Sequence, residues 1–374
     1  MRLVYLSPVP WSSFAQRPQK FVEWFNLRTG GQVLWIDPYP TRLPQLADFK
    51  RSGTSSPGEA QEHYPWLQLL RPRSLPIEPL PLIGRTNHLF WESIKKRVRD
   101  FIQGDDALIV AGKPSLLAIS LINHFDSIPS VYDAMDEFPA FYKGLSSFSM
   151  AARERELVNT VDYLWVTSSR LKERWCEYRD DVRFIPNGLD TRFFANIHSK
   201  PLSTGPKIFG YVGTIATWFD WKWIIALANA RQDDIVQLIG PNFHPTSLPL
   251  PRNIQLLPAC AHDEAMQAMR RFDVGLIPFL RNPLTASVDP IKFYEYRASG
   301  LPVISTAFGE MNFRRHEQGT YISESLDDIA ELAGNALAHS DTSAFSTQFI
   351  HDHSWHARFD STGILTQHGA LATP

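Results

Sequence analysis

The feature that most constrains the fold is a repeated alternation between short apolar runs and longer segments with helical periodicity. Short apolar runs are typical of strands buried on both faces, and helices between them supply the crossovers that parallel strands need. In the first half of the chain, strands are expected at residues 3–6, 33–36, 107–110, 130–132, 163–166 and 182–185, and helices at 17–27, 91–102, 115–124, 150–160 and 169–178. The pattern predicts a parallel sheet covered by helices on both faces.

The alternation stops once and then starts again. Residues 196–206, NIHSKPLSTGP, lack apolar periodicity and are typical of a linker, whereas the Pro-rich residues 52–82 indicate an irregular surface excursion. After the linker, strands are expected at 208–212, 236–239, 254–257, 274–278 and 302–306, and helices at 223–230, 263–270, 292–298 and 326–338. We therefore expect an α/β protein with two doubly wound, Rossmann-like domains, residues 1–200 and 207–345, that face each other across a ligand cleft.

The charge balance excludes one large class of partner. The chain has 37 Lys and Arg against 39 Asp and Glu, so it lacks the positive field that holds a nucleic-acid backbone. The start, MRLVYLSPVPW, has too short an apolar run for a signal peptide, and no run approaches a spanning helix. A cytoplasmic protein is expected. Cys176 and Cys260 are too few for a disulfide framework, and we expect each to be buried.

The most informative segment is residues 272–306, FDVGLIPFLRNPLTASVDPIKFYEYRASGLPVIST. An apolar strand is followed by a loop, and Asp289 and Pro290 then precede a helix that carries Lys292 and Glu295. Pro suits a first helical turn and Asp suits an N-cap. The free N–H groups of a helix N-terminus attract phosphate, and Lys292 adds a positive charge. Glu295 can accept hydrogen bonds from a vicinal diol.

This run resembles the donor-nucleotide motif of retaining GT-B glycosyltransferases of the family 4-like group, in its bacterial surface-polysaccharide branch. The resemblance covers about thirty residues in order, with the spacing P-x-K-x-x-E-Y-x-A-x-G-x-P-V intact. It implies that Lys292 binds the donor diphosphate and acts in catalysis, and that Glu295 binds the ribose hydroxyls. It also implies that residues 346–374 form a terminal helix that crosses back to the first domain.

The sequence departs from the family pattern at two places. The first glutamate of the usual pair is replaced by Ser287, so Asp289 either contacts the donor sugar instead or caps the helix. The strand GYVGTIATWFDWKW has no basic residue before Lys222, although Gly213 and Thr214 stand in the expected turn. By resemblance this turn faces the diphosphate; otherwise it is a structural turn. Gly240 and Pro258, at two further strand ends, match positions that hold the nucleobase or simply end their strands.

The first half carries two segments that resemble the same branch, WSSFAQRPQKF and VYDAMDEFPAF. Both follow an expected strand. In the second, Asp133 and Asp136 are candidates for binding the acceptor, and Asp133 is also the candidate catalytic carboxylate. The alternative for Asp133 is a capping role. Arg17 is a candidate contact to an anionic part of the acceptor, and the alternative is an ordinary surface arginine.

These observations predict a hexosyltransferase that moves a sugar from a UDP- or GDP-linked donor to a glycan or lipid-linked acceptor, with retention, in surface-polysaccharide synthesis. A GT-B-like sugar-nucleotide epimerase and a non-catalytic sugar-nucleotide-binding partner remain alternatives. No cofactor is expected, and the twelve histidines show no metal-ligand spacing, so no metal is expected. The basic residues of the helix at 91–102 are a candidate peripheral contact to the inner face of the plasma membrane, or else a solvated face.

Overall fold

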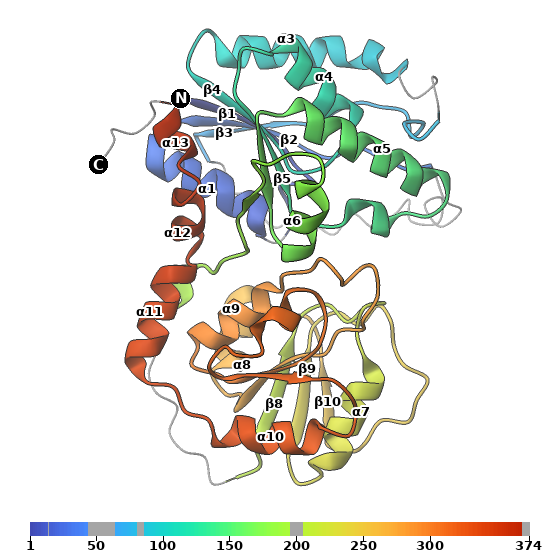
Figure 1. Ribbon diagram of the computed structural model, residues 1–374, viewed down its shortest axis with the longest axis vertical. Coiled ribbons are helices and arrows are strands. Elements are labelled where there is room, and N and C mark those ends of the chain that lie inside the picture. The colour runs from blue at the N-terminus through green and yellow to red at the C-terminus, as the bar shows by residue number, and fades with distance from the viewer. Residues whose placement is uncertain (14, 44–63, 81–85, 195–204, 369–374) are drawn as a thin grey trace. The chain divides into compact units, whose positions relative to one another are not determined.

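The computed structural model describes residues 1–13, 15–43, 64–80, 86–194 and 205–368 (Figure 1). The chain folds into two compact units. Unit 1 comprises Met1–Thr167, Leu171–Ile185 and Phe359–Pro374, and unit 2 comprises Ser168–Arg170 and Pro186–Arg358. Most of the expected linker lies outside the described residues, so the boundary at residue 200 stays a prediction.

Unit 1 contains a seven-stranded parallel sheet in the order β3-β2-β1-β4-β5-β6-β7. Its strands are β1 (Arg2–Leu6), β2 (Gln32–Ile36), β3 (Leu67–Leu70), β4 (Ala107–Ala111), β5 (Ser130–Ala134), β6 (Tyr163–Val166) and β7 (Arg183–Phe184). The strand order reverses beside β1, which pairs with β2 on one side and β4 on the other. Ligands of doubly wound sheets bind at the carboxyl ends of the strands at such a point.

Helices cover both faces of this sheet. Successive side chains of a strand point to opposite faces, so an apolar strand gives the sheet two apolar faces that must be covered. In β1, Val4 and Leu6 join the core beneath one set of helices, whereas the Tyr5 ring lies 5.6 Å from that of Phe21 on α1. The helices are α1 (Arg17–Thr29), α3 (His88–Ile102), α4 (Leu116–His124), α5 (Leu145–Thr160) and α6 (Ser169–Cys176), with a 3₁₀ turn η2 (Phe138–Phe141). The α1 helix ends at Gly30, whose left-handed backbone (φ 62°) allows its N–H to bond to Asn26.

Unit 2 contains a six-stranded parallel sheet in the order β10-β9-β8-β11-β12-β13. Its strands are β8 (Ile208–Val212), β9 (Ile235–Ile239), β10 (Ile254–Leu257), β11 (Val274–Ile277), β12 (Val303–Thr306) and β13 (Thr320–Ser323). Its helices are α7 (Trp221–Ala230), α8 (His262–Met269), α9 (Ile291–Ala298), α10 (Ile329–Ala338) and α11 (Ser343–His353), with 3₁₀ turns η3 (Thr191–Phe194) and η4 (Gly309–Arg314). One apolar cluster packs under α8 and α9, and a second packs under α7 and α10.

The carboxyl-terminal end of the chain packs against unit 1. It forms α12 (Trp355–Asp360) and α13 (Ile364–Gln367). The Phe359 ring lies 5.1 Å from that of Phe21, and the Trp24 indole donates a 2.9 Å hydrogen bond to Asp360. The chain thus returns to unit 1 at Phe359, through short helices rather than the single terminal helix expected, and the predicted bounds of 346–374 stay a prediction.

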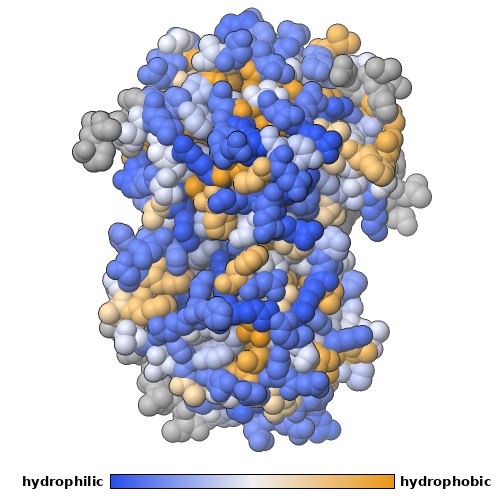
Figure 2. Space-filling model, in the orientation of Figure 1, coloured by the Kyte–Doolittle hydropathy of each residue, from blue (hydrophilic) through white to orange (hydrophobic). Residues whose placement is uncertain are grey.

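The α/β class with two doubly wound parallel sheets is confirmed, with three local differences. The Pro-rich segment contains strand β3, and β13 was not predicted at all. Cys176 and Cys260 are exposed, so the expectation that both are buried is wrong. On the face drawn in Figure 2, hydrophilic side chains predominate over both units and apolar ones lie in separate groups.

Candidate active site

The start of α9 places the two main donor-binding candidates together. The Lys292 ammonium pairs with the Glu295 carboxylate one turn later on the same helix, and their side chains are 25% and 10% exposed. The His262 imidazole, which meets the Phe193 ring edge-on with ring centroids 4.3 Å apart, is close enough for both charges to act on it. Burial lowers the pKa of His262, and the Glu295 carboxylate opposes this shift. An ammonium and a carboxylate thus lie side by side at a helix N-terminus, where the ammonium can bind a diphosphate and the carboxylate can accept hydrogen bonds from ribose hydroxyls.

Two glycine turns follow the neighbouring strands β8 and β9. Gly213 (φ 158°) and Gly240 (φ 143°) pack so closely that a Cβ on Gly240 would lie 2.1 Å from the carbonyl oxygen of Gly213. The turn after β8 is held by a 2.9 Å hydrogen bond from the Tyr211 hydroxyl to the carbonyl of Thr214. Thr214 is half-buried and Pro258, after β10, is exposed. Their predicted contacts with the donor stay predictions.

Asp289 makes contacts that its sequence position did not suggest. Its carboxylate accepts hydrogen bonds from the Asn187 N–H (2.7 Å) and the Tyr294 hydroxyl (2.9 Å), and it pairs with Arg314 at 2.6 Å. The side chain is fully buried. The capping alternative is wrong, because α9 begins at Ile291 with Pro290 at the N-cap and has no side-chain cap. The donor-sugar contact stays a prediction.

Sequence reasoning missed the partners of Asp289. The side chain of Asn187 also donates a 2.7 Å hydrogen bond to the carbonyl of Asp289. Arg314 lies 25 positions further on, in η4, and its guanidinium stacks 3.9 Å from the centroid of the Phe293 ring. No spacing rule joins these positions, because their contact is produced by the packing of η4 against α9.

In unit 1, Arg17 and Asp133 form a buried bidentate ion pair at the carboxyl ends of β1 and β5. The Arg17 Nε lies 2.8 Å from one carboxylate oxygen of Asp133, and Nη2 lies 2.8 Å from the other. The two side chains are 3% and 0% exposed. The Arg17 guanidinium also lies 5.4 Å from the centroid of the Phe359 ring. Arg17 is therefore not a surface arginine, and the pair is held by packing as well as by charge.

Asp136 is in a different electrostatic situation from Asp133. Its carboxylate makes no hydrogen bond or ion pair with any residue that the structure describes. Burial raises the pKa of Asp136 to about 7; the Arg17 charge opposes this shift, and the Asp133 charge adds to it. A carboxyl group that titrates near neutral pH suits a general base.

A small cavity lies near the strand reversal in unit 1. Its volume is about 20 Å³, and it is lined at the ends of β1, β2 and β4 by Ser7, Asp37, Lys113 and Ser115, among others. A cavity of this volume holds about one water molecule, so it accommodates a small polar group rather than a sugar ring.

The helix predicted at 91–102 is α3. Within 91–102, Trp91, Ile94 and Val98 are buried, whereas Lys96, Arg97 and Arg99 are exposed. Basic side chains are thus available to an anionic surface, and the exposed apolar side chains of α3 are Leu89 and Phe90 at its start. None of the helices in the described part of the chain is long and apolar enough to cross a membrane.

Comparisons with known proteins agree with the fold described above. No family model matches the chain. It is 24% identical over 302 residues, 74% of its own length and 72% of the relative's, to the "Putative teichuronic acid biosynthesis glycosyltransferase TuaH" of Bacillus subtilis strain 168. Among solved structures it resembles AviGT4, a glycosyltransferase involved in avilamycin A biosynthesis, with a TM-score of 0.61, 13% identity and coverage of 98% and 97% of the two chains.

A second structural neighbour is "Trehalose-6-phosphate from E. coli bound with UDP-2-fluoro glucose", with a TM-score of 0.62, 10% identity and full coverage of both chains. At such identities the likeness shows the fold, and the fold is GT-B. Together with the sequence relative, this likeness supports the glycosyltransferase class predicted from the sequence.

Among the described residues, no group of three or more His, Cys, Asp or Glu side chains is arranged to hold a metal ion. Metal-independent chemistry stays a prediction, because the donor's own diphosphate is a frequent metal ligand.

Proposed function

We propose that the protein transfers a sugar from a UDP- or GDP-linked donor to a hydroxyl of a glycan or lipid-linked acceptor, with retention of configuration, in bacterial surface-polysaccharide synthesis. The observation that carries the proposal is the Lys292–Glu295 pair at the start of α9, on the sheet edge that also presents the Gly213 turn. The relative named for teichuronic acid biosynthesis supports the polysaccharide assignment.

On the donor side, the diphosphate binds where Lys292 and the N–H groups of α9 converge. The ion pair between Lys292 and Glu295 opens, because the diphosphate attracts the ammonium and the ribose hydroxyls donate to the carboxylate. As the bond from the anomeric carbon to the diphosphate breaks, negative charge grows on the leaving oxygen. Lys292 and the helix N-terminus stabilise that charge, which is the electrostatic contribution enzymes rely on most.

On the acceptor side, Asp136 rather than Asp133 is proposed as the base. Both oxygens of Asp133 are taken by Arg17, so this pair positions the segment, while Asp136 keeps its carboxylate available. The acceptor oxygen forms the new bond to the anomeric carbon on the face that the diphosphate leaves. The hydroxyl proton passes to Asp136, which has a pKa of about 7.

We also propose that the enzyme lies at the inner face of the plasma membrane when its acceptor is lipid-linked. The exposed basic side chains of α3 would then contact anionic headgroups.

A transfer and hydrolysis assay with a panel of UDP- and GDP-sugars tests the function. We expect release of UDP or GDP that depends on an added glycan or lipid-linked acceptor, with the anomeric configuration of the product retained by NMR. Interconversion of the sugar nucleotide without an acceptor would indicate the epimerase, and nucleotide binding without any turnover would indicate a non-catalytic protein. Transfer should survive EDTA, and restoration by Mg²⁺ after EDTA treatment would contradict the metal-free mechanism.

A further inference from the structure

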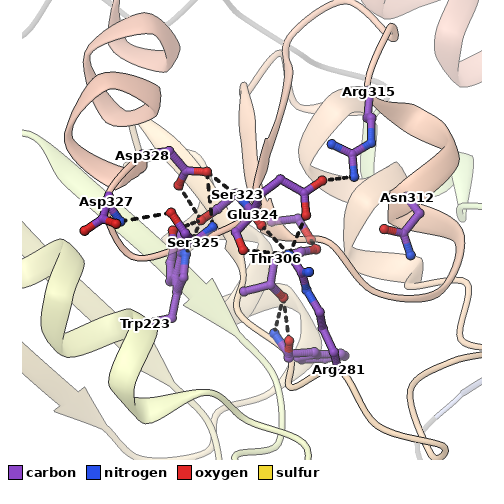
Figure 3. Close-up of polar contacts among 12 residues, drawn as sticks. Trp223, Arg281, Thr306, Asn312, Arg315, Ser323, Glu324, Ser325, Asp327 and Asp328 are labelled. Atoms are coloured by element: carbon purple, nitrogen blue, oxygen red, sulfur yellow. Dashed lines mark hydrogen bonds and ion pairs between the residues drawn. The ribbon is translucent and has the colours of Figure 1, made fainter.

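Two arginines and a glutamate from three different loops meet on the carboxyl edge of the unit 2 sheet (Figure 3). Arg281 follows β11, Arg315 follows η4, and Glu324 follows β13. One carboxylate oxygen of Glu324 accepts a 2.7 Å hydrogen bond from Arg281, and the other pairs with Arg315. We call these three residues the guanidinium clamp. Arg281 lies within the 272–306 segment, but none of the three residues was assigned a contact with the donor, and none is a partner of Asp289.

The clamp has one positive charge in excess. Arg281 and Arg315 share the single carboxylate of Glu324, and neither forms an ion pair with another described residue. The side chains of Arg281, Arg315 and Glu324 are 48%, 39% and 49% exposed. Both guanidinium groups can therefore be reached from solvent on the edge where doubly wound sheets bind ligands.

Arg281 is held independently of the Glu324 carboxylate. It also donates 3.1 Å hydrogen bonds to the backbone carbonyls of Ser323 and Glu324. The backbone of that turn is fixed in its own right, because Asp328 accepts a 2.7 Å hydrogen bond from the Glu324 N–H and another of 2.7 Å from the Ser323 hydroxyl. Removal of the carboxylate would thus leave the guanidinium of Arg281 in place.

The Glu324 carboxylate is the part of the clamp that can be exchanged. A half-exposed ion pair contributes little to stability, so the side chain can rotate into solvent at small expense. The clamp then presents two guanidinium groups spaced to take the two oxygens of one carboxylate, a group that arginines bind through charge-assisted hydrogen bonds.

We propose that Arg281 and Arg315 bind the carboxylate of an acidic sugar, a hexuronate unit, and that Glu324 occupies this site until the sugar arrives. The inference rests on the proposed sugar transfer and adds its substrate class. The hexuronate is carried either by the nucleotide donor or by the acceptor glycan, and the two sources share the same carboxylate chemistry.

Calorimetry on the full chain distinguishes the two sources. UDP-glucuronate is compared with UDP-glucose, and methyl glucuronide with methyl glucoside. Tighter binding of UDP-glucuronate assigns the carboxylate to the donor, and tighter binding of methyl glucuronide assigns it to the acceptor. Arg281→Gln and Arg315→Gln should each weaken the preferred uronate by about tenfold, the loss of one charge-assisted hydrogen bond at a half-exposed site, and leave the neutral partner unchanged.

Two further variants separate a binding site from a structural brace. Glu324→Gln removes the competing charge, so it should bind the uronate about two- to fivefold more tightly. Arg231→Gln is the matched control, because Arg231 pairs with Asp234 in the same unit at comparable exposure but lies at the end of α7. The inference is overturned if neither uronate is preferred, or if Arg281→Gln behaves as Arg231→Gln does. UDP affinity is measured alongside. UDP binding without a preference for uronates contradicts the inference and leaves the proposed transfer standing. Clamp-dependent binding of methyl glucuronide without UDP binding supports the inference and contradicts the proposed transfer.

Discussion

At the scale of single residues, the carboxylates at the strand ends differ in what surrounds them. Asp289 and Asp133 each have an arginine within hydrogen-bonding distance, and both are completely buried. A buried carboxylate that is hydrogen-bonded to such partners is held in one position and serves as a fixed brace. Asp136 has no hydrogen-bond or ion-pair partner among the residues that the structure describes, and Glu295 pairs with a lysine that a bound diphosphate can attract instead. The chemistry is therefore expected at these two carboxylates, and Asp289 and Asp133 hold their segments in place.

Lys292 gives the most direct test of the donor site. The leaving diphosphate gains charge in the transition state, so Lys292→Ala should reduce turnover by roughly 10²–10³-fold, more than it reduces donor affinity. Lys292→Arg should restore only part of the rate, because a planar guanidinium does not replace a compact ammonium. Initial rates and calorimetric donor affinities are the measurements.

Stability must be measured with these variants, because Lys292→Ala leaves the Glu295 carboxylate without its cation. We expect a loss of about 1–2 kcal/mol in the free energy of unfolding. Lys172→Ala, at an exposed position on α6, is the control and should change neither property. A Lys292→Ala enzyme that turns over at the native rate would remove Lys292 from the mechanism.

Asp136 predicts a particular pH dependence. With a pKa of about 7, the carboxyl group is protonated below neutrality, so kcat/KM for the acceptor should rise with pH and level off above about 7. Asp136→Asn should abolish this rise and lower the rate by about 10²-fold or more. Asp126→Asn, an exposed aspartate after α4, should keep the native profile.

The contribution of Asp136 to stability changes with pH in the opposite direction to its contribution to the rate. Because the folded state raises the pKa of Asp136, this group favours folding at acidic pH, and that contribution is lost as pH rises through about 7. Asp136→Asn should therefore be more stable than the native protein above pH 7. Urea unfolding at pH 5 and pH 8 measures the difference, and a native-like pH dependence in the variant would show that Asp136 is not the group that titrates.

At the scale of elements, the sequence pattern predicts every central strand but misses one of the two edge strands of each sheet. Central strands such as β4 are apolar throughout, because both faces are buried. The edge strands β3 and β13 are short and partly polar, and β3 lies in a Pro-rich segment, so neither shows a continuous apolar run. Likewise, Lys292 and Glu295 follow from a local motif, whereas the Asp289–Arg314 contact depends on two elements that meet only in the folded unit.

The η4 turn supports the donor loop from behind, and Gly309 makes this possible. Its backbone is left-handed (φ 42°), and a Cβ there would lie 2.4 Å from the carbonyl oxygen of Val288 and 2.7 Å from that of Thr285. Gly309→Ala should displace the loop that leads into α9 and destabilise unit 2 by about 1–3 kcal/mol. Nucleotide affinity should fall with it, as calorimetry and melting curves will show.

Gly334→Ala is the matched control for this variant. Gly334 lies inside α10 with nothing within 4 Å of an added Cβ, so alanine should stabilise the helix by roughly 0.5–1 kcal/mol. If both substitutions leave nucleotide affinity and melting equally unchanged, η4 does not support the donor loop.

At the scale of the whole molecule, the chain does not complete its first unit until its end. Unit 1 is interrupted by all of unit 2, and its last segment begins at Phe359. This segment contributes the Asp360 carboxylate, which accepts from the Trp24 indole and pairs with Arg28 on α1. The family resemblance implied such a crossing, but its partners on α1 could not be predicted, because they are more than 300 positions away in the sequence.

Phe359 couples this crossing to the acceptor side of the proposed site. Its fully buried ring packs 5.1 Å from Phe21 and 5.4 Å from Trp24, and the Arg17 guanidinium lies over it at 5.4 Å. Phe359→Ala should lower the free energy of unfolding of unit 1 by about 3–5 kcal/mol, the usual result of removing a buried aromatic ring. It should also loosen Arg17, and through the ion pair with Asp133 it should reduce kcat/KM for the acceptor more than donor affinity, because the donor residues lie in unit 2.

Calorimetric unfolding, in which unit 1 should melt earlier than unit 2, and initial rates at varied acceptor concentration are the two measurements. Phe148→Ala, in the same unit but 77% exposed, should leave both unchanged. If Phe359→Ala melts and turns over as Phe148→Ala does, the terminal segment neither stabilises unit 1 nor positions Arg17.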